Sequence, residues 1–135
     1  MNFEDMFEVG KILVVEDDVL VAKTIVDTLA VLGHNDVLMA SDLKEASQTV
    51  SEQKIDLAFL DVKPAKGTRI FDLGKSLAKS GARVVFMTGH ERLEMAQATV
   101  GVEFIEKPIS PSRLKATLHR AIIREPLRTE NAHHI

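Results

Sequence analysis

Five short apolar segments recur along the chain, separated by longer stretches in which apolar and polar positions are mixed. The segments are rich in Val, Ile, Leu and Phe and are nearly continuous, whereas a half-exposed strand would alternate apolar with polar positions. Continuous apolar runs of this length are typical of parallel strands that are covered on both faces. We therefore predict five parallel strands, at residues 11–15, 36–39, 57–60, 83–87 and 102–105.

The stretches between these segments show helical spacing. In the clearest, residues 19–32, Val21, Ile25 and Leu29 fall on one side, and the helix is expected to end before Gly33. Weaker helical patterns follow at residues 41–51, 71–79, 92–98 and 112–124, with Ser41 and Ser110 as expected N-caps and Pro111 at the first position of the last helix. Five alternating strand and helix units predict an α/β fold, a flavodoxin-like (βα)5 doubly wound sandwich with strand order 2-1-3-4-5.

The length and composition limit the classes of function. With 135 residues the chain has room for one domain, which we place at 11–124 between an N-terminal extension, 1–10, and a polar, flexible tail, 125–135. The formal charge of −3 argues against nucleic acid as a partner, and the lack of Cys excludes disulfides and zinc–thiolate sites. There is no signal peptide and no apolar run of membrane-spanning length, so we expect no membrane contact and a cytoplasmic location.

Polar residues interrupt the apolar pattern where four of the strands end. Glu16, Asp17 and Asp18 follow the first strand, Asp61 the third, Thr88 the fourth and Lys107 the fifth. The carboxyl ends of parallel strands meet at one edge of a sheet, so these side chains are expected to converge there. Taken singly, each has a structural interpretation: either aspartate after the first strand could be the N-cap of the first helix, and a threonine after a strand commonly bonds a nearby backbone group.

Converging carboxylates repel one another unless a cation lies among them, and hard oxygen ligands suit Mg²⁺. A lysine ammonium and a threonine hydroxyl beside such a site would bind the oxygens of a phosphoryl group that is carried onto a carboxylate. We therefore expect Asp61 to be the nucleophile, with Lys107 and Thr88 as its partners.

In these features residues 11–124 resemble a receiver domain of the bacterial two-component response regulators. The resemblance implies that Asp61 is the phosphoacceptor and that Asp17 and Asp18 hold Mg²⁺, with Asp18 as the more direct ligand. The backbone carbonyl of Lys63 would complete the protein's share of the metal shell.

The same resemblance assigns the switch residues. Thr88 would turn toward the phosphoryl oxygens, Lys107 would pair with them, and Phe104 would be the aromatic residue that changes rotamer; an ordinary core residue is the alternative for Phe104. Lys63 and His90 would flank the phosphoryl group and tune its lifetime, or be solvated loop residues. The loop after Asp61 is atypical of the family.

The resemblance also implies partners. A sensor histidine kinase or phosphotransfer protein would dock on the first helix beside Asp61, with Val31 as a candidate contact. The chain would be a stand-alone response regulator, not an enzyme beyond self-phosphorylation and autodephosphorylation. We expect it to act through an unknown downstream protein, as a monomer or a phosphorylation-dependent dimer.

Three alternatives compete with this interpretation. The first is a pseudo-receiver that binds partners without phosphorylation. The second is an aspartyl-phosphate phosphotransferase or phosphatase of the haloacid-dehalogenase type, which needs an acid where this chain has Lys63. The third is a flavin or nucleotide binder, although no Gly-rich phosphate loop follows the first strand.

Overall fold

The computed structural model describes residues 9–62, 69–89 and 102–123. The strands are β1 (Ile12–Val15), β2 (Val37–Ala40), β3 (Leu57–Val62), β4 (Arg83–Thr88) and β5 (Glu103–Glu106). The helices in the described part are α2 (Val19–Val31), α3 (Leu43–Glu52), α4 (Arg69–Lys79) and α6 (Pro111–Ile123).

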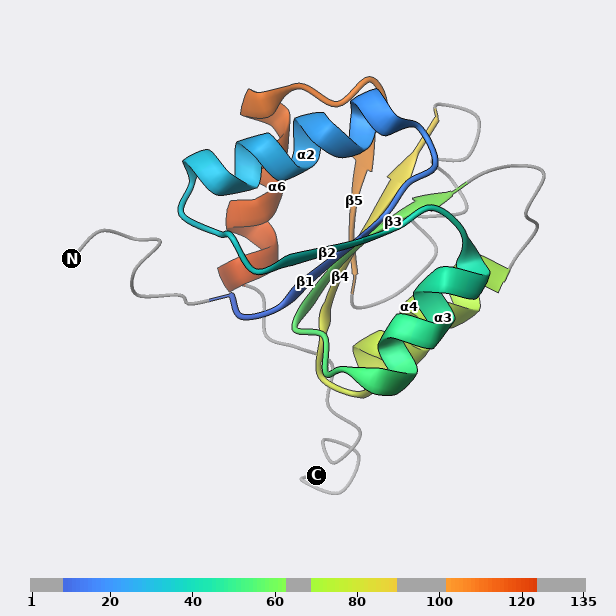
Figure 1. The fold of residues 1–135 in the computed structure, drawn as a ribbon. Helices are drawn as coiled ribbons and strands as arrows, with labels where there is room; N and C mark the ends of the chain where they lie inside the picture. Colours follow the sequence, from blue (N-terminus) through green and yellow to red (C-terminus); the bar gives the residue numbers. More distant parts are fainter. Residues whose placement is uncertain (1–8, 63–68, 90–101, 124–135) are drawn as a thin grey trace.

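The five strands form one parallel sheet in the order β2-β1-β3-β4-β5 (Figure 1). The predicted flavodoxin-like fold and its strand order are therefore confirmed. The central strands β1 and β3 are buried along their whole length, which explains why their sequences are continuously apolar. The predicted helix at residues 92–98 lies outside the described residues, as do 1–8 of the expected extension and the whole of 125–135.

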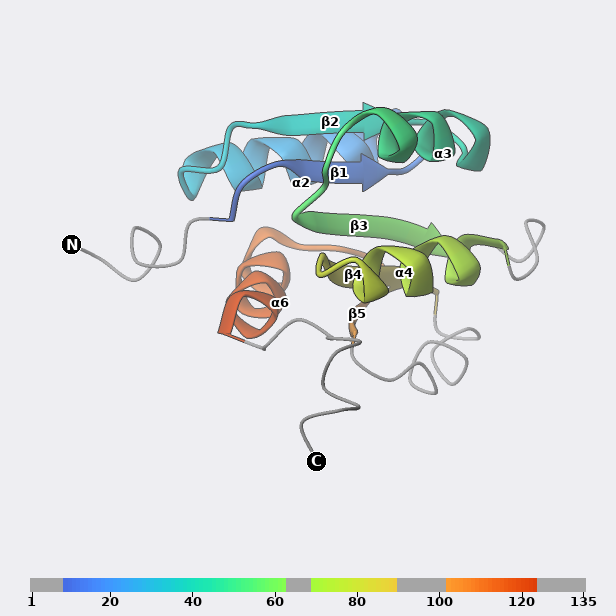
Figure 2. The ribbon, with the colours of Figure 1, turned by 90° about the horizontal axis from the view of Figure 1, so that it is seen from below.

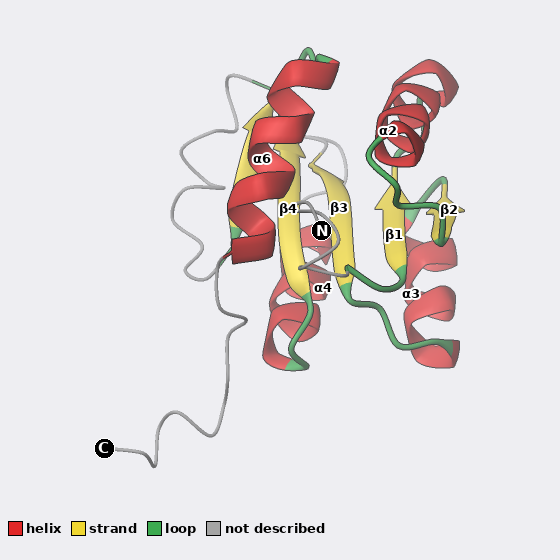
Figure 3. Ribbon diagram, turned by 90° about the vertical axis from the view of Figure 1, so that its left-hand side faces the viewer, coloured by secondary structure: helices red, strands yellow, loops and turns green. Residues whose placement is uncertain are grey.

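Helices cover both faces of the sheet, α2 and α6 on one and α3 and α4 on the other (Figures 2 and 3). Successive residues of a strand point to opposite faces, so each strand contributes to two cores. In β1, Ile12 and Val14 pack under α2 and α6, whereas Leu13 and Val15 pack under α3 and α4. Fully burying one such side chain stabilises the fold by about 1.5–3 kcal/mol.

The register of the sheet aligns the carboxyl ends of its strands. Val15 in β1 lies opposite Leu60 in β3, and Thr88 in β4 lies opposite Glu106 in β5. The residues that follow β1 and β5 are therefore placed next to Asp61 near the end of β3. No helix in the described part of the chain is long and apolar enough to cross a bilayer.

The face covered by α4 includes one very close approach. Gly74 of α4 is buried against the ring of Phe86 in β4, and a Cβ added to Gly74 would lie 2.8 Å from Cε1 of that ring. The ring is also held by Phe71, whose centroid is 4.9 Å from that of Phe86. Gly74 is therefore needed for packing, because helix propensity alone would favour Ala.

We expect Gly74→Ala to lower the free energy of unfolding by about 1–3 kcal/mol, because the added methyl overpacks the contact with Phe86. Urea denaturation measures the change. The control is Ser76→Ala, an exposed position on the same helix, which should change stability by less than about 0.5 kcal/mol. A stable Gly74→Ala variant would mean that α4 can move away from the sheet at little cost.

Candidate functional site

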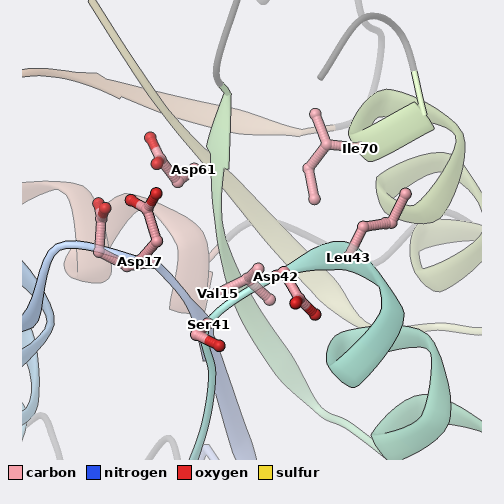
Figure 4. Close-up of a pocket in the computed structure, with 8 residues that line it drawn as sticks. Val15, Asp17, Ser41, Asp42, Leu43, Asp61 and Ile70 are labelled. Atoms are coloured by element: carbon pink, nitrogen blue, oxygen red, sulfur yellow. The ribbon is translucent and has the colours of Figure 1, made fainter. Parts of the chain in front are cut away.

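Three carboxylates meet at the carboxyl edge of the sheet. Glu16 and Asp17 follow β1, Asp61 belongs to β3, and one carboxylate oxygen from each residue lies within 4.8 Å of the others. We call Glu16, Asp17 and Asp61 the acidic cluster. All three line a cavity of about 30 Å³, and Figure 4 shows Asp17 and Asp61 beside it. A space of that size accommodates a water molecule or a small ion.

Lys107 joins two members of this cluster. Its ammonium Nζ lies 2.8 Å from Oδ1 of Asp61 and 2.9 Å from Oε1 of Glu16. The Glu16 side chain is fully buried and that of Asp61 is 4% exposed, whereas that of Lys107 is 26% exposed. The backbone N–H of Lys107 donates to the carbonyl of Thr88 at 2.8 Å, so this lysine is fixed to the end of β4 as well.

Burial and charge shift the protonation of this pair in defined directions. Burial raises the pKa of Glu16 above its ordinary value, against the opposing effect of its hydrogen bond from Lys107. Burial alone would lower the pKa of Lys107, but its hydrogen bonds and attraction to Asp61 and Glu16 raise that pKa overall. Lys107 is therefore held as an ammonium between two carboxylates.

Thr88 ends β4 at this edge of the sheet, and Phe104 lies two residues before the end of β5. Thr88 is fully buried, and its hydroxyl donates to the carbonyl of Gly89 at 3.0 Å. Phe104 of β5 is half-buried: it packs against the core under α3 and α4 and also lines a groove between β5 and α6. The core contact of Phe104, offered as an alternative from the sequence, is thus present in the structure.

The sequence predicts Asp17 and Asp18 as the pair that holds Mg²⁺; of these two, Asp17 is in the acidic cluster and Asp18 is not. Oδ1 of Asp18 accepts the backbone N–H of Leu20 at 2.9 Å and that of Val21 at 3.2 Å, which makes Asp18 the N-cap of α2. The carboxylate of Asp18 therefore caps the helix. Glu16 is the first residue after β1 and lies beside Asp17 in the acidic cluster.

The sequence contained a signal for Glu16 that the prediction did not use. Glu16 is the first acidic residue after β1, and its backbone N–H still donates to the carbonyl of Ala40 in β2 at 3.0 Å. Its side chain extends from the end of the strand, and Oε2 accepts the N–H of Asp18 at 3.1 Å. The acid nearest the strand end therefore faces Asp61, and the third acid caps the helix.

Two other predicted site residues, Lys63 and His90, are not among the residues that the structure describes. Lys63, expected to offer a backbone carbonyl to the metal and to tune phosphoryl lifetime, lies outside the described residues. His90, expected to tune that lifetime too, also lies outside them.

Comparisons with known proteins show what this chain is similar to. A sequence model of the family described as "Response regulator receiver domain" matches residues 12–119. The phyllosphere-induced regulator PhyR of Methylorubrum extorquens is 29% identical over 127 residues, covering 91% of this chain and 48% of the relative. The sensory transduction protein LytT of Bacillus subtilis is 28% identical over 134 residues, covering 92% of this chain and 54% of the relative. The chain spans about half the length of these curated relatives.

Solved structures give the same result. The receiver domain of NtrX from Brucella abortus superposes with a TM-score of 0.71 at 29% identity, covering 83% of this chain and 98% of that one. A response regulator receiver protein from Sinorhizobium medicae shares the fold, with a TM-score of 0.70 at 22% identity, covering 87% of this chain and 98% of that one.

Because Lys107 pairs with two buried carboxylates, we expect its replacement to destabilise the protein by an amount that depends on pH. Lys107→Met leaves two buried carboxylates without their ammonium, so we expect a loss of about 1–3 kcal/mol in the free energy of unfolding at pH 7. The loss should be smaller at pH 5, because the pKa of Glu16 is already raised and rises further once the attraction to Lys107 is removed. Urea denaturation at the two pH values measures both effects.

The control for this prediction is Lys23→Met. Lys23 forms an exposed ion pair with Asp27 one helical turn away, at 2.7 Å, and such pairs contribute about 0.3–0.5 kcal/mol. Equal losses for the two lysine variants, or a Lys107→Met loss that is the same at pH 7 and pH 5, would contradict the arrangement described here.

Proposed function

Because the chain belongs to the response regulator receiver domain family of two-component signalling, we propose that it is phosphorylated on Asp61 and signals through protein contacts. The observation that carries this proposal is the ammonium of Lys107, 2.8 Å from Oδ1 of Asp61 at the carboxyl edge of the sheet. A carboxylate with a fixed cation beside it is suited to receive a phosphoryl group, since the cation offsets the charge that arrives.

The proposed step is an in-line displacement at phosphorus. An oxygen of Asp61 forms a bond to phosphorus while the bond from phosphorus to the donor's leaving atom breaks, and the electron pair of that bond stays with the leaving atom. Lys107, already within ion-pair distance of Asp61, then pairs with a phosphoryl oxygen. Glu16 keeps the other contact of the ammonium, so the lysine stays oriented throughout.

The acidic cluster fits Mg²⁺. Its donors are carboxylate oxygens, which hard cations prefer, and they converge on a cavity large enough for a small ion. Glu16, Asp17 and Asp61 would hold the ion, with the predicted carbonyl of Lys63. When bound, Mg²⁺ neutralises charge on the phosphoryl oxygens. Asp18 is not proposed as a ligand, because its carboxylate caps α2.

Thr88 and Phe104 are proposed to transmit the change. The hydroxyl of Thr88 would exchange its bond to the Gly89 carbonyl for one to a phosphoryl oxygen. Phe104, which has both a core contact and an exposed side, would then move inward and alter the surface between β5 and α6. Tuning of phosphoryl lifetime by Lys63 and His90 stays a prediction.

A sensor histidine kinase or phosphotransfer protein is proposed as the phosphoryl donor. It would dock at the start of α2, where Val19 and Leu20 are 77% and 76% exposed beside the acidic cluster. Val31, the contact expected from the sequence, is 86% exposed but lies at the other end of this 13-residue helix, about 18 Å away along its axis. Val19 and Leu20 are therefore the better candidates.

If Asp17 is a Mg²⁺ ligand and Asp18 is not, substitutions at these two positions should affect Mg²⁺ binding differently. We expect Mg²⁺ to raise the melting temperature of the parent and of Asp18→Ser equally, because Ser preserves the N-cap and Asp18 holds no metal. Asp17→Ser should weaken the apparent Mg²⁺ affinity at least ~10-fold, because it removes one charged ligand. Thermal unfolding over a series of Mg²⁺ concentrations gives the affinities. Loss of the response in Asp18→Ser instead would restore the assignment made from the sequence.

Phosphorylation is tested by intact-protein mass after incubation with Mg²⁺ and acetyl phosphate. We expect the parent to gain one phosphoryl group and Asp61→Asn to gain none. Asp72→Asn, which removes an exposed carboxylate from α4, is the matched control and should react like the parent. A folded parent that binds Mg²⁺ but gains no mass would overturn the proposal in favour of a pseudo-receiver that binds its partners unmodified.

A further inference from the structure

One arginine reaches from the last helix back to the segment that carries Lys107. Arg113 lies in the first turn of α6, and its Nη1 donates to the carbonyl of Glu106 at 3.1 Å and, more weakly, to that of Pro108 at 3.5 Å. These two carbonyls belong to the residues immediately before and after Lys107. The guanidinium therefore bonds the backbone on both sides of the lysine.

The same segment is held from the opposite side by the sheet. The backbone N–H of Lys107 donates to the carbonyl of Thr88 at 2.8 Å. The segment 106–108 is thus fixed between the end of β4 and the start of α6, while the ammonium of Lys107 lies within 2.9 Å of Asp61 and Glu16. A lysine side chain has four rotatable bonds, so the position of its backbone determines how often its ammonium reaches a given point.

The helix itself gives no reason for an arginine at this position. Ser110 accepts the N–H of Arg113 through its hydroxyl at 3.2 Å, which is the bond of an N-cap serine to the third helical residue. In a capping box that third residue is Glu or Gln, and a cation in the first turn opposes the helix dipole. The bonds to the strand-end carbonyls are what the guanidinium contributes here.

We propose that Arg113 is a positioning residue, which fixes the segment 106–108 so that the ammonium of Lys107 meets Asp61. The proposal rests on the proposed function, because it assigns Arg113 a part in phosphoryl transfer through Lys107. Arg113 does not itself contact the acidic cluster in the described structure.

The kinetic test uses Arg113→Gln, which keeps the serine cap and can complete the capping box but cannot bond the two carbonyls. We expect a melting temperature close to that of the parent, because the improved helix start offsets the lost bonds. The initial rate of phosphoryl uptake from acetyl phosphate, followed by intact mass, should fall by roughly threefold or more. Arg113→Lys, which keeps a charged donor, should recover part of the lost rate.

The matched control is Arg120→Gln. Arg120 also joins α6 to β5, through an ion pair with Glu103 at 3.1 Å, but that pair lies at the far end of β5 from Lys107. Its loss should leave the rate of phosphoryl uptake unchanged. An unchanged rate in Arg113→Gln, or an equal fall in both arginine variants, would overturn the proposal.

A second measurement does not depend on phosphorylation. If Arg113 positions Lys107, then Lys107→Met should shift the urea midpoint less in the Arg113→Gln background than in the parent, because the ammonium is already misplaced there. Additive shifts would refute the positioning role, whether or not the parent reacts with acetyl phosphate. A parent that gains no mass while the shifts are non-additive would instead refute phosphorylation and leave the positioning role supported.

Discussion

The contact between the ammonium of Lys107 and the carboxylates of Glu16 and Asp61 is the interaction on which this end of the molecule depends. Both carboxylate side chains are nearly inaccessible to water, and two buried negative charges so close together are unfavourable unless a cation offsets them. The ammonium does so while remaining partly exposed. One cation thereby allows two carboxylates to be buried side by side at the carboxyl edge of the sheet.

The parallel sheet is the reason why these three residues can meet. Glu16, Asp61 and Lys107 are far apart in the sequence, but each lies at or just beyond the carboxyl end of a strand. Parallel pairing brings the carboxyl ends of the strands to one edge of the sheet. The register of the strands decides which residues lie side by side at that edge. The cores above and below the sheet therefore stabilise the site indirectly, because they fix the strands whose ends form it.

Most of the fold could be predicted from the sequence, because a strand buried on both faces has a continuous apolar run. All five strands were found within two residues of their ends, and Asp61, Thr88 and Lys107 were found as polar residues that end those runs. The acidic residues after β1 could not be resolved in the same way. Three acids in a row are equivalent by composition, and only the path of the backbone decides which of them faces Asp61 and which caps α2. The contacts of Arg113 could not be predicted from the sequence either, because they depend on where a long side chain of α6 meets the end of β5.

The close approach of α4 to the sheet bears on how the sequences of relatives can vary. The space that a larger side chain at Gly74 would need is taken by the ring of Phe86, and that ring is itself wedged against Phe71. The two positions share one volume although they belong to different elements. In relatives with this packing, a residue larger than glycine in the helix should occur together with a smaller one in the strand. The residues at positions 74 and 86 should therefore co-vary, while the acidic cluster and Lys107 at the carboxyl edge of the sheet stay the same.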